Sequence, residues 1–179
     1  KENKSALQEI ASFCTVPAII GCIRSEGSDL YNSAAVCFDN KLQAYYDKIL
    51  LPNYDVFDEK RFFTPGNAPK PIMVPIKGQK RKIGLQICED LWDEQYSCKV
   101  SDLQKELGAE LIVNISASPY SKNKIKERKR LVASKAGRLG IPFIYCNIIG
   151  GQDELIFDGS SFAVTKEGSV LSEAVSFAE

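Results

Sequence analysis

The sequence predicts an α/β fold, a mixed β-sheet covered by helices, from two observations. Short apolar runs rich in β-branched residues alternate with longer amphipathic segments, which is typical of strands connected by helices. Pairs of apolar runs separated by short polar turns also occur, and these predict antiparallel strands in the same molecule. The 179 residues, 44% of them apolar, suffice for a single globular domain over residues 1–179.

The first half of the chain is expected to begin with a helix and continue as strands. Apolar residues recur on one stripe of residues 2–13, which predicts a helix, and the apolar run at residues 16–23 predicts a strand. Two further runs, residues 32–38 and 42–49, flank a polar turn and are expected to pair as a hairpin. Residues 52–75 contain several Pro and Gly and predict a long functional loop with one short helical piece.

The second half alternates strands and helices. Gly108 and Gly140 directly follow the two helical patterns, as expected for helices that end in a left-handed residue. The predicted elements are, in order, a strand at 82–88, a helix at 94–107, a strand at 111–116, a helix at 123–139, a strand at 142–149 and a closing pair of strands at 160–164 and 169–174.

Charge and hydropathy exclude several classes of partner. The 23 basic and 23 acidic residues balance, so neither nucleic acid nor a membrane is an expected partner. No apolar run approaches the roughly 18 residues of a membrane span, and no signal peptide is recognisable, so we expect a cytoplasmic protein. Residues 122–138 hold eight basic residues and one acid. Because no aromatic residues interleave with them, a solvated helix face is favoured over a phosphate or nucleic-acid site.

The reactive residue types narrow the possible chemistry. Histidine is absent, which removes Ser-His-Asp and Cys-His catalysis and the usual His-containing zinc sites. The six cysteines form no Cys-x-x-Cys pair, so reduced thiols are expected. Four of them lie in apolar runs and are interpreted as small buried hydrophobes: Cys14, Cys22, Cys37 and Cys146.

Cys88 differs from these cysteines because it ends a predicted buried strand and precedes two carboxylates, Glu89 and Asp90. Active groups collect beyond the carboxyl ends of strands in such sheets, which makes Cys88 a candidate nucleophile. A thiol without a histidine partner needs a lysine, an arginine or a carboxylate to become reactive. Lys48, which also ends a predicted strand, is the best local candidate, although composition alone favours a solvated surface lysine.

Four motifs carry a resemblance to a known family. They are Lys48-Ile-Leu-Leu-Pro-Asn-Tyr54-Asp-Val-Phe-Asp-Glu59 with Phe63-Thr-Pro-Gly66, Ile87-Cys88-Glu89-Asp90-Leu-Trp92, Asn114-Ile-Ser-Ala-Ser118-Pro-Tyr, and Gly150-Gly-Gln-Asp-Glu-Leu-Ile-Phe-Asp-Gly159. In this order they closely resemble the glutaminase domain of glutamine-dependent NAD synthetase. The Lys and Cys motifs alone would indicate only the nitrilase superfamily.

The resemblance implies a nitrilase-like αββα sandwich and a Glu-Lys-Cys triad that hydrolyses glutamine to glutamate and ammonia through a thioester. Matched residue by residue, Cys88 is the nucleophile and Lys48 is the triad lysine. An ammonium beside the developing oxyanion would stabilise the tetrahedral state. Glu59 matches the family's second glutamate, which holds the lysine in place; its alternative interpretation is a surface charge on a loop.

The resemblance also implies a set of substrate-binding residues. Tyr54, Ser118 and Lys124 match positions that contact glutamine in the family. Lys124 or a neighbour would pair with the α-carboxylate of glutamine, and Glu89 would receive its α-ammonium. These roles are expected in addition to those of the catalytic residues.

Two parts of the family pattern have no match in these 179 residues. The general-base glutamate belongs upstream of residues 2–13, so we expect a sandwich that is incomplete at its N-terminus. The C-terminal synthetase domain, which uses ATP and Mg²⁺, is not matched either, so the sequence is expected to be truncated at both ends. No cofactor is expected for the glutaminase part, and a homo-oligomer is implied.

The alternatives are an amidase or N-carbamoyl hydrolase of the same superfamily and a non-catalytic nitrilase-like oligomerisation module. The Gly-Gly-Gln-Asp-Glu motif argues against the first. The joint presence of Lys48, Cys88 and Tyr54 argues against the second.

Overall fold

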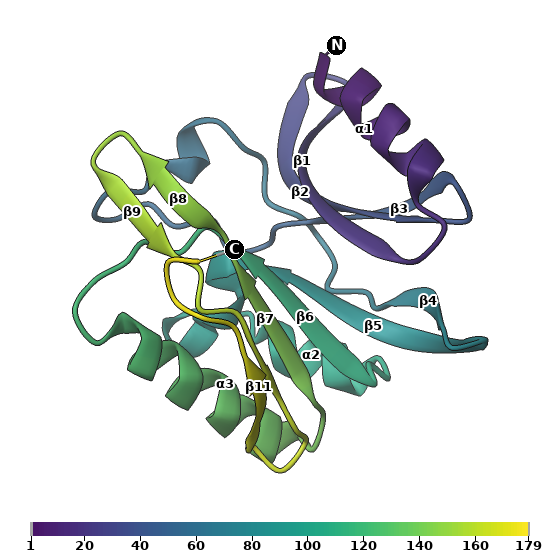
Figure 1. The fold of residues 1–179 in the computed structure, drawn as a ribbon. Coiled ribbons are helices and arrows are strands. Elements are labelled where there is room, and N and C mark those ends of the chain that lie inside the picture. Colours follow the sequence, from purple (N-terminus) through teal and green to yellow (C-terminus); the bar gives the residue numbers. More distant parts are fainter. Residues whose placement is uncertain (1, 179) are drawn as a thin grey trace.

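The computed structural model describes residues 2–178, which form four layers in the order helix, sheet, sheet, helix (Figure 1). The elements are α1 (Glu2–Phe13), β1 (Ala18–Glu26), β2 (Asp29–Phe38), β3 (Lys41–Asp47), η1 (Glu59–Arg61), β4 (Ile72–Ile76), β5 (Gln79–Ile87), η2 (Cys88–Leu91), η3 (Asp93–Gln95), α2 (Val100–Glu106), β6 (Leu111–Ser116), α3 (Lys124–Leu139), β7 (Phe143–Asn147), β8 (Ile149–Gln152), β9 (Leu155–Asp158), β10 (Phe162–Val164) and β11 (Val170–Glu173).

The first sheet is an antiparallel meander in the order β1-β2-β3, with α1 on its outer face. Successive side chains of a strand point to opposite faces, so β2 packs against α1 on one face and against the second sheet on the other. Ala35 and Cys37 pack with Leu7 and Ala11 of α1. The alternate residues of β2 face the second sheet. The buried part of β2, residues 33–37, therefore joins α1 to the rest of the molecule.

The second sheet is mixed and has the order β11-β10-β7-β6-β5-β4. Its central strands β5, β6 and β7 are parallel, and the strands outside them are antiparallel. α2 and α3 form the two crossovers between the parallel strands, and both cover the outer face of this sheet (Figure 1). Val132 and Ala136 of α3 pack on Ile112, Phe143 and other residues of that face.

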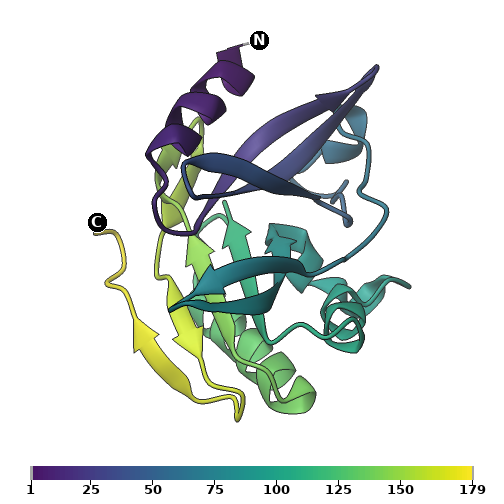
Figure 2. The same cartoon turned by 90° about the vertical axis from the view of Figure 1, so that its right-hand side faces the viewer.

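The inner faces of the two sheets meet in an apolar cluster. Ala34, Val36 and Tyr46 of the first sheet pack with Leu85 and Ile87 of the second. Figure 2 shows the two sheets stacked between α1 and α3. The predicted α/β class and the αββα arrangement are confirmed.

Several predicted elements match the structure, and strand β4 was missed. The helices predicted at 2–13 and 123–139 and the strand predicted at 111–116 are present almost residue for residue. Residues 52–75 were expected to be a loop, yet they end in β4, and β5 begins at Gln79 rather than at residue 82. Pro75 lies within β4, and proline normally argues against a strand. β4 is the edge strand of its sheet, where a missing N–H costs little.

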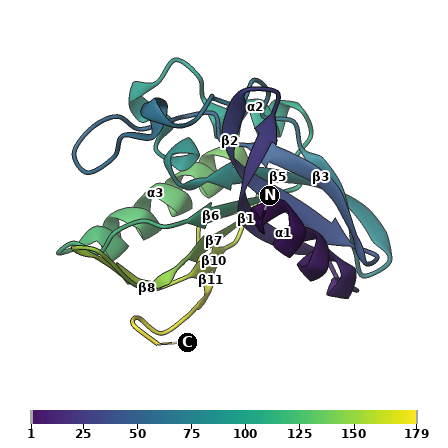
Figure 3. The same cartoon turned by 90° about the horizontal axis from the view of Figure 1, so that it is seen from above.

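Two other predictions need correction. The helix predicted at 94–107 begins only at Val100, and the short turn η3 precedes it. The strand predicted at 142–149 ends at Asn147, and a separate hairpin of β8 and β9 follows. That hairpin is short and rich in glycine, so its sequence carries no alternating apolar pattern. Figure 3 shows that the long loop between β3 and β4, with η1 on it, projects to one side of the sheets.

The basic face of α3 is only partly solvated, contrary to the sequence-based prediction. Arg128 and Lys135 are buried, and each forms an ion pair with a buried aspartate, Asp158 and Asp93 respectively. The partners come from distant segments, so the sequence of α3 alone gives no sign of them. Among residues 2–178, no helix is long and apolar enough to cross a membrane.

Candidate active site

The main cavity lies where the carboxyl ends of β5, β6 and β7 meet the inner face of the first sheet. It has a volume of about 430 Å³. Cys88 follows β5, while Ser116 ends β6 and Asn147 ends β7, and all three line the cavity. Parallel strands end at the same edge of a sheet, so side chains distant in sequence converge there.

Cys88 sits on a strained turn at this edge. Its φ is 44°, in the left-handed region that residues other than glycine rarely adopt. Such strain costs about 1–3 kcal/mol and is concentrated at functional sites. Burial raises the pKa of the Cys88 thiol above its ordinary value, whereas the Lys48 ammonium and a hydrogen bond from Ser116 act in the opposite direction. The resting thiol is therefore protonated at neutral pH and needs a proton acceptor to become a nucleophile.

Lys48 is held beside the thiol by the loop that follows β3. Its side chain is only 1% exposed, and its Nζ donates to both carboxylate oxygens of Glu59, at 2.7 and 2.8 Å. Both side chains line the cavity with Cys88. A buried ammonium needs such a partner because an unpaired charge is costly to remove from water. The structure brings together the three residues expected to be catalytic.

Glu89 lies at the border between the main cavity and a second pocket. Its carboxylate is 5% exposed and accepts hydrogen bonds from the hydroxyl groups of Tyr54 and Tyr96, each at 2.9 Å. Burial raises the pKa of both tyrosines, to about 12 for Tyr96. The second pocket, about 480 Å³, is lined by Tyr54, Glu89, Trp92, Glu94, Gln95 and Tyr96.

Three residues expected to bind substrate do not line the main cavity: Tyr54, which lines the second pocket instead, Lys124 and Ser118. Lys124 lies over the ring of Trp92, with its Nζ 4.1 Å from the ring centroid, and pairs with Glu127 on its own helix. Trp92 lines the second pocket, whereas Lys124 does not. Ser118 is buried, and the cavity is lined instead by its neighbours Ser116 and Ala117.

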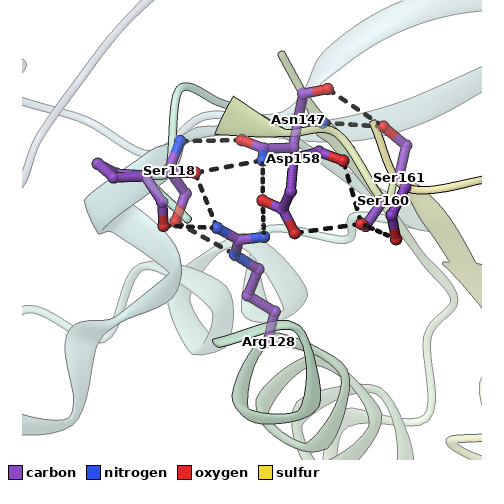
Figure 4. Close-up of polar contacts among 8 residues, drawn as sticks. Ser118, Arg128, Asn147, Asp158, Ser160 and Ser161 are labelled. Atoms are coloured by element: carbon purple, nitrogen blue, oxygen red, sulfur yellow. Dashed lines mark hydrogen bonds and ion pairs between the residues drawn. The ribbon is translucent and has the colours of Figure 1, made fainter. Parts of the chain in front are cut away.

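Ser118 belongs to a buried polar network centred on Arg128 (Figure 4). Arg128 donates to the Ser118 hydroxyl, to the carbonyl oxygens of Ser118 and Pro119, and to the carboxylate of Asp158. The Asn147 amide bonds both the N–H and the carbonyl of Ser118, at 2.8 and 3.3 Å. The network fixes the backbone that leads out of β6, next to the cavity.

Sequence-based reasoning assigned no functional role to four residues near Cys88: Asn114, Ser116, Tyr145 and Cys146. Ser116 donates to the side chain of Asn114, and the Asn114 amide donates to the carbonyl of Cys88. Cys146 was expected to be buried, but it is exposed and lines the cavity, because β7 turns Phe143, Tyr145 and Asn147 toward the core instead. Among the described residues 2–178, the Tyr145 hydroxyl is buried without a hydrogen-bond partner, and burial raises its pKa to about 12. Only the alternation of β7 could have indicated the exposure of Cys146.

The cavity thus combines a thiol on a strained turn, a buried ammonium paired to a carboxylate, and a second carboxylate that two tyrosines orient. A thiol can attack an electrophilic carbon, and an ammonium can stabilise the oxyanion that forms. The Glu89 carboxylate borders the cavity and can accept a further hydrogen bond from a cationic group. This set suits acyl transfer on a small substrate that carries both a carbonyl and a positive charge.

Comparisons with known proteins point to one family. The family model described as carbon-nitrogen hydrolase matches residues 1–179. The chain is 40% identical over 182 residues to a glutamine-dependent NAD(+) synthetase of Thermotoga maritima, an alignment that covers 100% of this chain and 30% of the relative. The chain therefore spans about 30% of the length of these curated relatives.

Solved structures agree with this result. The chain superposes on a glutamine-dependent NAD+ synthetase from Acinetobacter baumannii with a TM-score of 0.88 and 33% identity, covering 98% of this chain and 32% of that one. A carbon-nitrogen hydrolase from Helicobacter pylori gives a TM-score of 0.83 and 27% identity, covering 99% of this chain and 64% of that one. The chain belongs to the carbon-nitrogen hydrolase family.

Proposed function

We propose that this chain is a glutaminase unit that hydrolyses the side-chain amide of glutamine, with Cys88 as nucleophile and Lys48 as oxyanion-stabilising residue. The observation that carries the proposal is the convergence of Cys88, Lys48 and Glu59 in one cavity at the strand ends. Supporting it, the chain is similar over its whole length to proteins named glutamine-dependent NAD(+) synthetase.

The proposed reaction has two steps. The Cys88 thiolate attacks the amide carbon of glutamine, and the Lys48 ammonium stabilises the tetrahedral oxyanion as it forms. Collapse of this state expels ammonia and leaves a γ-glutamyl thioester on the sulfur. Water then attacks the thioester, releasing glutamate and regenerating the thiol. The balance is one glutamine and one water consumed for one glutamate and one ammonia.

Glu59 is proposed to keep Lys48 charged and oriented, since it bonds the ammonium through both oxygens. The thiol proton needs a further acceptor. In the family pattern this is a glutamate that matches no residue of this sequence, and we propose that the full-length enzyme supplies it. Residues 1–179 are then a partial carbon-nitrogen hydrolase domain.

Recognition of glutamine is proposed to use the charges around Glu89. Its carboxylate borders the main cavity and would receive the α-ammonium, with Tyr54 orienting it through the hydroxyl bond. Lys124, beside Trp92 at the second pocket, would pair with the α-carboxylate. Ser118 would act through the position of its backbone, because its side chain is buried and does not line the main cavity.

The ammonia is proposed to serve an ATP-dependent amination of nicotinic acid adenine dinucleotide to NAD, carried out by a C-terminal synthetase domain of the same enzyme. ATP and Mg²⁺ belong to that domain, and no step at Cys88 is routed through them. The relatives' names support this assignment, as does the share of their length that the chain covers. A cytoplasmic homo-oligomer is part of the proposal.

The test is glutamine hydrolysis by the full-length enzyme, measured as ammonia release. Cys88→Ala is expected to abolish release, and Lys48→Met to reduce it on the order of 100-fold or more, as for loss of an oxyanion donor. Cys14→Ala, at a half-buried thiol just beyond α1, is the matched control and should behave as wild type. Undiminished ammonia release by Cys88→Ala would rule out the mechanism.

Substrate choice is tested separately by comparing glutamine with a simple aliphatic amide at equal concentration. Preference for glutamine is expected, and Glu89→Gln should remove most of it by abolishing the charge that meets the α-ammonium. If the wild-type enzyme hydrolyses the simple amide faster than glutamine, the activity is that of an amidase.

A further inference from the structure

Asp90, two residues after Cys88, is a carboxylate with no exposed surface and four hydrogen-bond donors. Its Oδ1 accepts from the backbone N–H groups of Ile49, at 3.1 Å, and Leu50, at 2.8 Å. Its Oδ2 accepts from the Ile87 N–H, at 3.0 Å, and from the Tyr46 hydroxyl, at 2.8 Å. The side chain bonds no substrate-facing group, and it is not among the residues that line the main cavity.

The four donors come from two separate segments of the fold. Ile49 directly follows Lys48, and Ile87 directly precedes Cys88. Consecutive Cα atoms lie about 3.8 Å apart, so the hydrogen bonds to Asp90 act within one residue of both reactive side chains. One segment leaves the three-stranded sheet after β3, and the other ends β5 of the six-stranded sheet.

The two sheets otherwise face each other through apolar side chains. Apolar packing is non-directional and tolerates small shifts of one sheet against the other. Hydrogen bonds to a charged group are directional and about twice as strong as neutral ones. A carboxylate that bonds both segments therefore fixes their relative position where packing alone does not.

We propose that Asp90 is a positioning residue that holds the Lys48 segment and the Cys88 turn in register across the two sheets. The inference rests on the proposed function, since it takes Lys48 and Cys88 to act as a pair. Asp90 itself touches neither the substrate nor the reacting atoms.

The charge state of Asp90 fits this role. Burial raises the pKa of its carboxyl to about 6, while the N–H groups of Ile87 and Leu50, the Tyr46 hydroxyl and the Lys48 ammonium act to lower it. Above pH 6 the carboxylate form prevails, and this form accepts from all four donors. A protonated carboxyl would have to direct its own O–H at one of them.

Asp93 provides a matched control within the same turn region. It is also an aspartate, 2% exposed, and its partner is the buried Lys135 of α3. Asp93→Asn thus removes an equally buried charge and destabilises the fold, but it leaves the contacts between the Lys48 segment and the Cys88 turn in place. A comparison of the two variants separates positioning from general stability.

The experiment compares Asp90→Asn with Asp93→Asn in the full-length enzyme. It measures kcat and KM for glutamine, and the pH dependence of Cys88 alkylation by iodoacetamide, followed by peptide mass spectrometry. We expect Asp90→Asn to lower kcat on the order of 100-fold, the effect of misplacing a catalytic group by about 1 Å, with KM little changed. The Cys88 pKa should rise, because the Lys48 ammonium lowers it less from a displaced position.

Asp93→Asn should leave both the Cys88 pKa and kcat close to wild type. Tyr46→Phe, which removes one donor of the four and keeps the fold, should shift both quantities in the same direction as Asp90→Asn but by less. If Asp90→Asn does not fold, Tyr46→Phe decides the question.

The positioning role would be overturned if kcat and the Cys88 pKa of Asp90→Asn matched those of Asp93→Asn. It would also be overturned if Tyr46→Phe changed neither quantity. Full activity of Cys88→Ala would instead overturn the proposed function, so the two failures are distinguishable.

Discussion

The ion pair between Arg128 and Asp158 permits the sharpest stability prediction. The guanidinium and the carboxylate are 0% and 3% exposed and lie 2.7 Å apart (Figure 4). Removing one partner of a buried pair leaves an uncompensated buried charge and costs about 3–5 kcal/mol. We consider Asp158→Asn, which keeps the shape of the side chain and removes only its charge.

The expected loss lies at the lower end of that range. The amide oxygen of an asparagine can still accept one hydrogen bond from Arg128, and the guanidinium keeps its bonds to the carbonyl oxygens of Ser118 and Pro119. We therefore expect the free energy of unfolding to fall by about 3 kcal/mol. For a domain of this size, the melting temperature should fall by about 6–12 °C.

Urea denaturation of the chain measures this loss directly. Glu110→Gln is the control, because Glu110 pairs with Arg81 at 2.8 Å but both side chains are largely in solvent, at 43% and 48% exposed. Solvent screens such a pair, so only a small fraction of the loss seen for Asp158→Asn is expected. A decrease below about 1 kcal/mol for Asp158→Asn would refute the importance of the buried charge.

Three further predictions concern the site and its support. Lys48→Met removes the ammonium that lowers the Cys88 pKa, so this pKa should rise and iodoacetamide alkylation of Cys88 at pH 8 should slow. An unchanged alkylation rate would show that Lys48 does not act on the thiol. Tyr145→Phe removes a buried hydroxyl without a partner, so urea denaturation should show a loss of less than about 1 kcal/mol or a gain. Gly66→Ala places a Cβ against the backbone oxygen of Asp47 and should destabilise the chain by about 1–3 kcal/mol, measured by urea denaturation. An unchanged urea midpoint would show that the loop around Gly66 shifts to relieve the clash.

The sequence predicted the secondary structure best where periodicity was long and the ends were marked. The helix at residues 123–139 was recognisable because Gly140 follows it, and Gly140 adopts the left-handed conformation with φ 66°. The parallel strands β5 and β6 were recognisable as apolar runs. β4 was missed because Pro75 argues against a strand, and only the position of β4 at the sheet edge makes the proline acceptable.

In the candidate site, too, some residues could be identified from the local sequence and others could not. Cys88 and Lys48 were identified because each ends a strand and each lies in a specific motif. Their partner Glu59 came from the resemblance, and no local pattern indicated that its carboxylate reaches Lys48. Cys146 was expected in the core, because its apolar neighbours conceal the fact that it faces the cavity.

By itself, the sequence determined the alternation of strands and helices, the family motifs and the candidate nucleophile, because these depend on residues close together in the chain. Tertiary structure alone decided which charges are buried and what they hold. From the sequence alone, Arg128 is interpreted as one of the solvated basic residues of its helix. In the folded chain it is bonded to Asp158, which lies 30 residues away in the sequence. The sequence places Asp90 only in the turn after a strand. The fold brings the segment after β3 to the end of β5, and Asp90 then bonds both. The physical reason is that a buried charge is tolerable only beside its partners, and folding brings those partners from distant segments.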